Sequence, residues 1–126
     1  MTTSRQEAPV NDTDNVMRRV SRTEITLHED DGSIRPSSDA FMQGGPEGNV
    51  SVYLASETTP QRITENYPEV YVALVEVSVI RALGLEVELD QTAEDPGHCN
   101  ITGRKTRGKA RAIARSSRWA EGFGPQ

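Results

Sequence analysis

Residues 70–77 read Val-Tyr-Val-Ala-Leu-Val-Glu-Val and form the most apolar run in the chain. Valine, a β-branched residue, fills half of these positions. A short run of this composition is typical of a strand whose two faces are both covered. We therefore expect this segment to lie in the middle of a β-sheet.

Segments on either side of this run alternate apolar and polar residues, as half-buried strands do. Together with residues 70–77 they predict about five strands. The additional extended segments are expected at residues 16–27, with the clearest alternation at 24–27, and at residues 50–55, 85–89 and 98–103.

The remaining segments predict loops and helices. Residues 33–49 are rich in Pro, Ser, Gly and Asn, which predicts an irregular loop anchored in the core by Phe41 and Met42. Capping residues and glycines predict three helices. These helices are expected at residues 59–67, 78–83 and 108–121.

The order of these elements predicts an α+β fold with a single small mixed sheet of about five strands, two short helices and a C-terminal basic amphipathic helix. The 126 residues fit one domain, which we place at 16–121, between a disordered leader at 1–15 and a tail at 122–126. Beyond Met1, the leader has only Val10 as a large apolar residue, too little to offset the entropy of ordering it.

The sequence predicts a cytoplasmic protein without membrane contact. No segment approaches the ~20 apolar residues of a membrane span, and the N-terminus lacks the pattern of a signal or transit peptide. The single cysteine, Cys99, excludes an internal disulfide. His28 and His98, without a close-spaced third ligand, predict no metal site.

The net charge of −5 is distributed unevenly. Residues 1–103 hold 7 basic and 18 acidic residues, a net charge of −11, whereas residues 104–126 hold 7 basic and 1 acidic, a net charge of +6. The C-terminal segment is therefore expected either to dock on the acidic body or to contact an anionic partner.

Arginines recur every three or four residues through the expected C-terminal helix and so share one face. This face is either a solvated surface that neutralises the acidic body or a set of planar donors for phosphates and carboxylates. The aromatic residues that follow are anchors for a partner or part of the packing. The candidate anion- or partner-binding residues are Arg104, Arg107, Arg111, Arg115, Arg118 and Trp119.

His98 and Cys99 are adjacent, but neighbouring strand residues point to opposite faces of a sheet, so they do not predict a catalytic pair. Cys99 is expected in the core with Ile101. His98 is expected to share the other face with Asn100 and Thr102, either as a general base or ligand or as a structural histidine.

A further series along the chain consists of Arg18 or Arg19, then Ser51, then the Glu-Val-Glu of residues 86–88. This order resembles the motif series of one group of ADP-ribosyltransferases. The resemblance implies that the arginine contacts the phosphates of NAD, that Ser51 supports the nicotinamide ribose pocket, and that Glu88 orients the reacting groups. The same alternation around Glu88 is also typical of a half-buried edge strand.

The sequence leaves three functions open. The first is a non-catalytic interaction or regulatory protein, an accessory subunit of bacterial type that binds a larger protein. The second is a small enzyme acting on a nucleotide or phosphorylated ligand through His98, Ser51 and Glu88, with NAD as cofactor only under the resemblance above. The third is anion or nucleic-acid contact through the arginine face, which the acidic body disfavours. Only the enzyme requires its candidate residues to converge.

Overall fold

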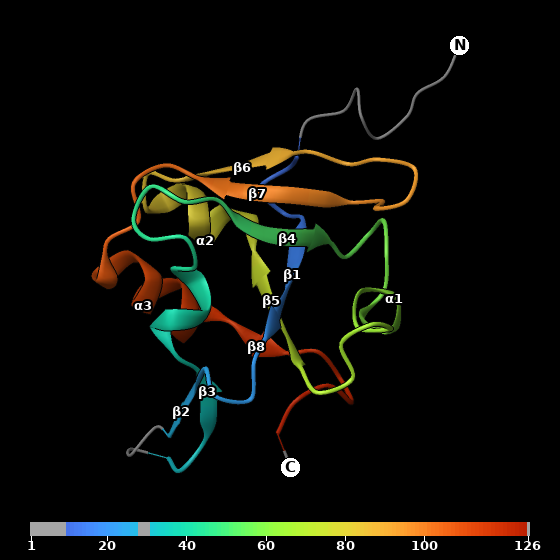
Figure 1. Ribbon diagram of the computed structural model, residues 1–126. Coiled ribbons are helices and arrows are strands. Elements are labelled where there is room, and N and C mark those ends of the chain that lie inside the picture. The colour runs from blue at the N-terminus through green and yellow to red at the C-terminus, as the bar shows by residue number, and fades with distance from the viewer. Residues whose placement is uncertain (1–9, 28–30, 126) are drawn as a thin grey trace.

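The computed structural model describes residues 10–27 and 31–125. Within these residues, the centre is a six-stranded antiparallel sheet in the order β6-β7-β4-β1-β5-β8, and β2 and β3 pair separately (Figure 1). The strands are β1 (Asn15–Val20), β2 (Ile25–Leu27), β3 (Ile34–Pro36), β4 (Val50–Leu54), β5 (Tyr71–Glu76), β6 (Glu86–Leu89), β7 (His98–Thr102) and β8 (Arg118–Trp119).

The helices are α1 (Pro60–Ile63), α2 (Val77–Ala82), α3 (Arg107–Ser116) and the 3-10 helix η2 (Ser38–Phe41). The side chains of Thr59 and Thr106 cap α1 and α3 by accepting a backbone N–H bond in the first turn. Gly84, with a φ of +81°, provides the left-handed residue that follows α2. In the part of the chain described, no helix is long and apolar enough to cross a membrane.

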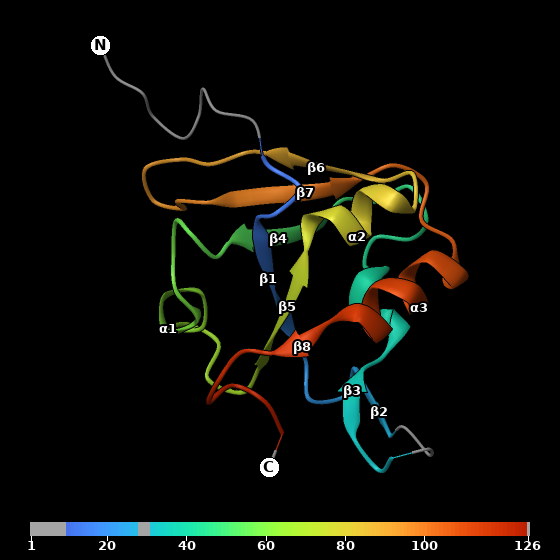
Figure 2. The same cartoon turned by 180° about the vertical axis from the view of Figure 1, so that it is seen from behind.

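The helices divide unequally between the two faces of the sheet. α2, α3 and η2 lie over one face and enclose the larger apolar core (Figure 2). On the other face, a smaller cluster joins Met17, Tyr53 and Ile63 to Ala120 and Phe123. On this second face, the side chains of β6 and β7 are exposed or half-buried. On the second face, the polar side chains of β6 and β7 are therefore accessible to a ligand.

The α+β class is confirmed, but the main sheet has six strands rather than about five, because β8 extends its edge. The expected single mixed sheet is wrong, since every pair in the main sheet is antiparallel and β2 and β3 form a second sheet. The apolar run forms β5, and both of its faces are covered, with Ala73 and Val75 in the larger core and Val72 in the smaller cluster. The expectation that it lies in the middle of the sheet is wrong. β4 and β1 occupy the middle, and β5 lies next to the edge strand.

The C-terminal helix is shorter than the sequence predicts. α3 ends at Ser116 rather than at residue 121, because the next residue is extended, with φ −84° and ψ 160°. Arg118 and Trp119 then pair with β5 as an edge strand. Arg104 precedes the helix, so the predicted single face of five helical arginines is wrong. Pairing with the sheet replaces the last helical turn that the arginine spacing suggested.

The segment at residues 33–49 is more regular than the expected loop, since it contains β3 and η2. Phe41 is fully buried in the larger core, and Met42 packs against that core. The predicted anchors are therefore in place, and they hold η2 against α3.

The packed part of the chain extends beyond the expected boundaries of 16 and 121. Residues 1–9 of the expected leader lie outside the described residues, but Val10 is buried and Asp12 pairs with Arg81 at 2.6 Å. In the expected tail, the carbonyl of Phe123 accepts a hydrogen bond from the backbone N–H of Val72 at 3.0 Å. Val10 and Asp12, in the described part of the expected leader, are therefore in contact with the domain, and so is Phe123 of the expected tail.

Candidate active site

A serine and a histidine meet on the partly open face of the sheet. In the antiparallel pairing of β4 with β7, Ser51 lies opposite Asn100 and Tyr53 lies opposite His98. This register places Ser51 and His98 diagonally on the same face, since alternate residues of a strand share a face. Their side chains are in contact, with Ser51 Oγ 3.1 Å from His98 Nε2.

The other ring nitrogen of His98 fixes the direction of this hydrogen bond. His98 Nδ1 lies 3.0 Å from the backbone carbonyl oxygen of Asp90, and a carbonyl can only accept. With the hydrogen on Nδ1, the neutral ring has its lone pair on Nε2, which accepts the hydroxyl hydrogen of Ser51. The carboxylate of Asp90 also lies 3.6 Å from Nδ1. A serine with an oriented base is the arrangement of an activated nucleophile.

The backbone before His98 is held tightly. Gly97 has a φ of +79°, and its carbonyl accepts the N–H of Leu54 at 2.9 Å. Its own N–H donates to Gln91 Oε1 at 3.0 Å. The ring of Tyr53 packs on the imidazole, with ring centroids 5.3 Å apart. Gly97 thus fixes the backbone before His98, and Tyr53 packs on its ring. The side chain of His98 is 14% exposed.

Arg19 adds a positive charge beside Tyr53, whose ring packs on His98. Its Nη2 donates to Tyr53 Oη at 3.3 Å, its Nη1 donates to the carbonyl of Ile63 at 2.8 Å, and its guanidinium stacks 4.1 Å from the ring centre of Tyr67. Burial raises the pKa of Tyr53, and nearby Arg19 opposes this shift. A cavity of about 130 Å³ adjoins these groups. Its lining includes Arg19, Tyr53, Arg62, Glu65, Tyr67, Glu94, Asp95 and Pro96.

Acidic and amide groups continue the same face outward. Glu88 lies opposite Asn100 in the β6–β7 pairing, and Asn100 lies opposite Ser51 in the next pairing. Glu88 accepts a hydrogen bond from Thr102 Oγ1 at 3.1 Å, and Asn100 Nδ2 donates to Asp90 Oδ2 at 3.3 Å. Ser51 and Glu88 therefore share one face, two strands apart.

Arg18 takes no part in this face. It is buried on the opposite side of β1, where its Nε donates to the carbonyl of Ala40 and its Nη1 to the backbone carbonyl of Ser51, both at 2.9 Å. Burial lowers the pKa of Arg18. Of the two arginines considered in the sequence, Arg19 is thus the one on the same face as the serine–histidine pair, in contact with Tyr53. Cys99 also faces the larger core and is fully buried, as strand alternation predicts.

The candidate arginines of the C-terminal segment fall into three groups. Arg104 pairs with Glu47 and Arg107 with Asp39, each at 2.6 Å. Arg118 is exposed on β8. Arg111 and Arg115 line a pocket between α3 and the β2–β3 pair. The structure therefore does not bring these five arginines together in one site.

Trp119 packs within the protein. Its Nε1 donates to the carbonyl of Ile34 at 2.8 Å, and its ring contacts Tyr71 edge to face at 5.5 Å. These contacts tie β3 to the edge of the main sheet. The interpretation of Trp119 as packing thus has a direct structural basis.

Sequence reasoning does not single out Asp90, Tyr53 or Arg35 as site residues. Asp90 directly follows β6, and the β6–β7 register would have placed it beside His98. Tyr53 could have been found as the second residue from Ser51 on the same strand face. Arg35, which lines the pocket on α3, has no sequence pattern of its own.

No protein-family model matches this chain, and no curated protein or solved structure matches it. The function must therefore be inferred from the geometry of the site.

Proposed function

We propose that the protein is a small enzyme in which Ser51 attacks an ester and His98 is its general base. The observation that supports this proposal is the 3.1 Å contact between Ser51 Oγ and His98 Nε2, combined with the 3.0 Å contact of Nδ1 with the carbonyl of Asp90. A serine hydroxyl is a weak nucleophile unless an adjacent, oriented base accepts its proton. Two of the three candidate catalytic residues, Ser51 and His98, are in contact, whereas Glu88 lies two strands from Ser51.

The reaction follows from the direction of the hydrogen bond. Ser51 Oγ bonds to the electrophilic carbon or phosphorus of the ester while its proton moves to His98 Nε2. The bond to the leaving alcohol breaks, and the alcohol takes that proton. Water then attacks the carbon or phosphorus bound to Ser51 Oγ and gives a proton to Nε2. Ser51 Oγ takes this proton back as its bond to the carboxylic or phosphoric acid product breaks.

A fluorophosphonate probe tests the nucleophile without a known substrate, because its phosphorus reacts with activated serines and expels fluoride. We expect wild-type protein to be labelled at Ser51, as located by peptide mass spectrometry. Labelling should be lost in Ser51→Ala and in His98→Ala. Hydrolysis of p-nitrophenyl acetate, p-nitrophenyl phosphate and bis(p-nitrophenyl) phosphate would then show whether the substrate is a carboxylic ester, a phosphate monoester or a phosphate diester.

Ser78→Ala is the matched control. Ser78 Oγ donates to a carboxylate oxygen of Glu76 at 2.7 Å, so it is a hydrogen-bonded serine without an imidazole partner. Its substitution should leave labelling unchanged. Folded wild-type protein that is not labelled, or labelling that persists in Ser51→Ala, would overturn the proposal.

ADP-ribosyl transfer from NAD is a second candidate, since Arg19 on β1, Ser51 on β4 and Glu88 on β6 lie on one face of the sheet, with β7 between Ser51 and Glu88. It assigns the decisive role to Glu88 rather than to a nucleophilic serine. Under this candidate, Glu88→Gln abolishes release of nicotinamide from NAD, measured by chromatography. Under the serine mechanism, Glu88→Gln retains fluorophosphonate labelling.

The accessory-protein function stays a prediction. It requires no reactive serine, so capture of a partner should survive the Ser51→Ala substitution. Loss of a stoichiometric partner on substitution of the α3 arginines alone would favour it.

A further inference from the structure

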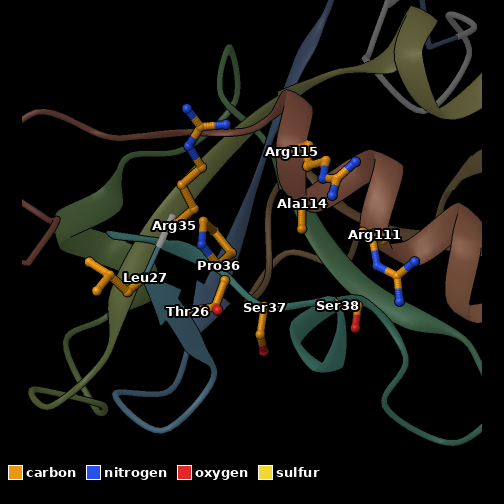
Figure 3. A pocket seen from close by; sticks show the side chains of 9 residues that line it. All are labelled: Thr26, Leu27, Arg35, Pro36, Ser37, Ser38, Arg111, Ala114 and Arg115. Carbon is orange, nitrogen blue, oxygen red and sulfur yellow. The ribbon is translucent and has the colours of Figure 1, made fainter. Parts of the chain in front are cut away.

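A second polar site lies on the side of the sheet that α3 covers, away from the face that carries Ser51. A pocket of about 360 Å³ opens there between α3 and the β2–β3 pair (Figure 3). Arg111, Ala114 and Arg115 line it from the helix, and Leu27, Arg35 and Pro36 line it from the strands. Its volume lies in the range of small-molecule sites.

The charges on the helix wall are not compensated. Arg104 and Arg107 have acidic partners, but the guanidinium groups of Arg111 and Arg115 make no ion pair or hydrogen bond within residues 10–27 and 31–125. They are four positions apart, so they project from the same side of α3 (Figure 3). Like charges at this spacing repel each other, and an anion between them would convert repulsion into attraction.

The opposite wall adds a third guanidinium in a fixed position. Arg35 is held by Asp31 at 3.2 Å and by the hydroxyl of Ser33 at 3.2 Å. Ser37, also in the wall, carries the one buried side-chain polar atom that has no partner among the described residues. The residues that line this pocket thus include three arginines and no acid, and Asp31 pairs with Arg35 from outside the lining, in a protein whose net charge is −5.

Apolar surface lies beside these charges. Leu27 is 62% exposed, and Pro36 and Ala114 form part of the lining. Exposed leucine next to unpaired arginines suits a ligand with one anionic end and one organic end. Guanidinium groups match the geometry of phosphate, with several donors in one plane.

We propose that this pocket binds a small organic phosphate. The phosphate lies between Arg111 and Arg115, and the organic part lies against Leu27 and Pro36. The site is independent of the Ser51–His98 pair, because it lies on the other side of the sheet.

Titration of ¹⁵N-labelled protein with adenosine 5′-monophosphate tests the site. We expect shifts in the amide signals of α3 and residues 34–38, competition by inorganic phosphate, and no such shifts with adenosine. Arg111→Gln and Arg115→Gln should each weaken binding about tenfold or more, as expected for loss of a charge-assisted hydrogen bond.

Arg118→Gln is the control, because it removes the same charge from an exposed position outside the pocket. It should leave the affinity unchanged. Equal weakening by Arg118→Gln, equal binding of adenosine, or the absence of shifts at about 10 mM nucleotide would overturn the proposal. Tenfold tighter binding of a single-stranded RNA than of the mononucleotide would assign the surface to nucleic acid instead.

Discussion

Ser51 and His98 are 47 positions apart in the chain, yet Oγ of the serine lies 3.1 Å from Nε2 of the histidine. Pairing of β4 with β7 creates this contact, and the carbonyl of Asp90 sets the direction of its hydrogen bond. The imidazole is thereby oriented by a backbone group at 3.0 Å, closer than the carboxylate at 3.6 Å.

Asp90→Ala should therefore be a mild substitution at this site. It removes the carboxylate but retains the backbone carbonyl that holds Nδ1. We expect the rate of fluorophosphonate labelling to fall by less than about tenfold, whereas His98→Ala should abolish labelling. A loss in Asp90→Ala as large as in His98→Ala would show that the carboxylate, rather than the carbonyl, orients the ring.

Gly97→Ala should distort the site directly. A Cβ at this position would lie 2.9 Å from Glu57 Cβ, and φ is +79°, so the variant is both crowded and strained. We expect a loss of about 1–3 kcal/mol in unfolding free energy, together with slower labelling of Ser51. Gly45→Ala, at a φ of +82° with nothing within 4 Å, measures strain alone. It should reduce stability less and leave labelling unchanged.

Arg18→Met should destabilise the protein from the interior. The variant keeps most of the apolar stem but leaves the carbonyls of Ala40 and Ser51 without their guanidinium donors, which lie at 2.9 Å. We expect the free energy of unfolding, measured in urea, to fall by about 2–4 kcal/mol. Arg22→Met, at a 53% exposed side chain, should cost less than about 1 kcal/mol. Similar values for the two variants would contradict the buried role of Arg18.

Lys105→Met should change how stability depends on pH. Lys105 is 1% exposed, its Nζ donates to the carbonyl of Gly103 at 2.8 Å, and burial lowers its pKa despite the opposing charge of Glu47. Between the lowered pKa and the ordinary lysine value, the unfolded chain binds more protons, so wild-type stability gains from this group as pH rises. Below that window, the full cost of burying the charge is present.

We therefore expect Lys105→Met to be more stable than wild type by about 1 kcal/mol at pH 7, with the difference shrinking as pH rises toward the ordinary lysine value. Urea unfolding across this range measures it. Lys109→Met, at a half-buried position on α3, controls for the loss of one charge. A variant that is less stable than wild type at pH 7 would show that the buried ammonium is net stabilising.

Local sequence patterns predicted the α+β class and much of the element order. Alternation at residues 98–103 placed Cys99 in the core and His98 on the polar face, because side chains of a strand point to opposite sides in turn. The pattern failed at residues 117–119. The arginine spacing favours a helix there, but Arg118 and Trp119 pair with β5 as a strand. Backbone hydrogen bonds to a neighbouring strand depend on tertiary contacts that a local pattern does not contain.

In the candidate site, too, local patterns predicted some features and tertiary contacts decided the others. By itself, the sequence determined which residue types are present and which side of its own strand each one faces. Only the tertiary structure decided that Ser51 lies beside His98 and that Arg19 rather than Arg18 shares their face. It also decided that, among the described residues, Arg104 and Arg107 pair with acids whereas the side chains of Arg111 and Arg115 do not. The physical reason is that strand order and register set distances between segments far apart in the chain, whereas periodicity sets only the local direction of each side chain.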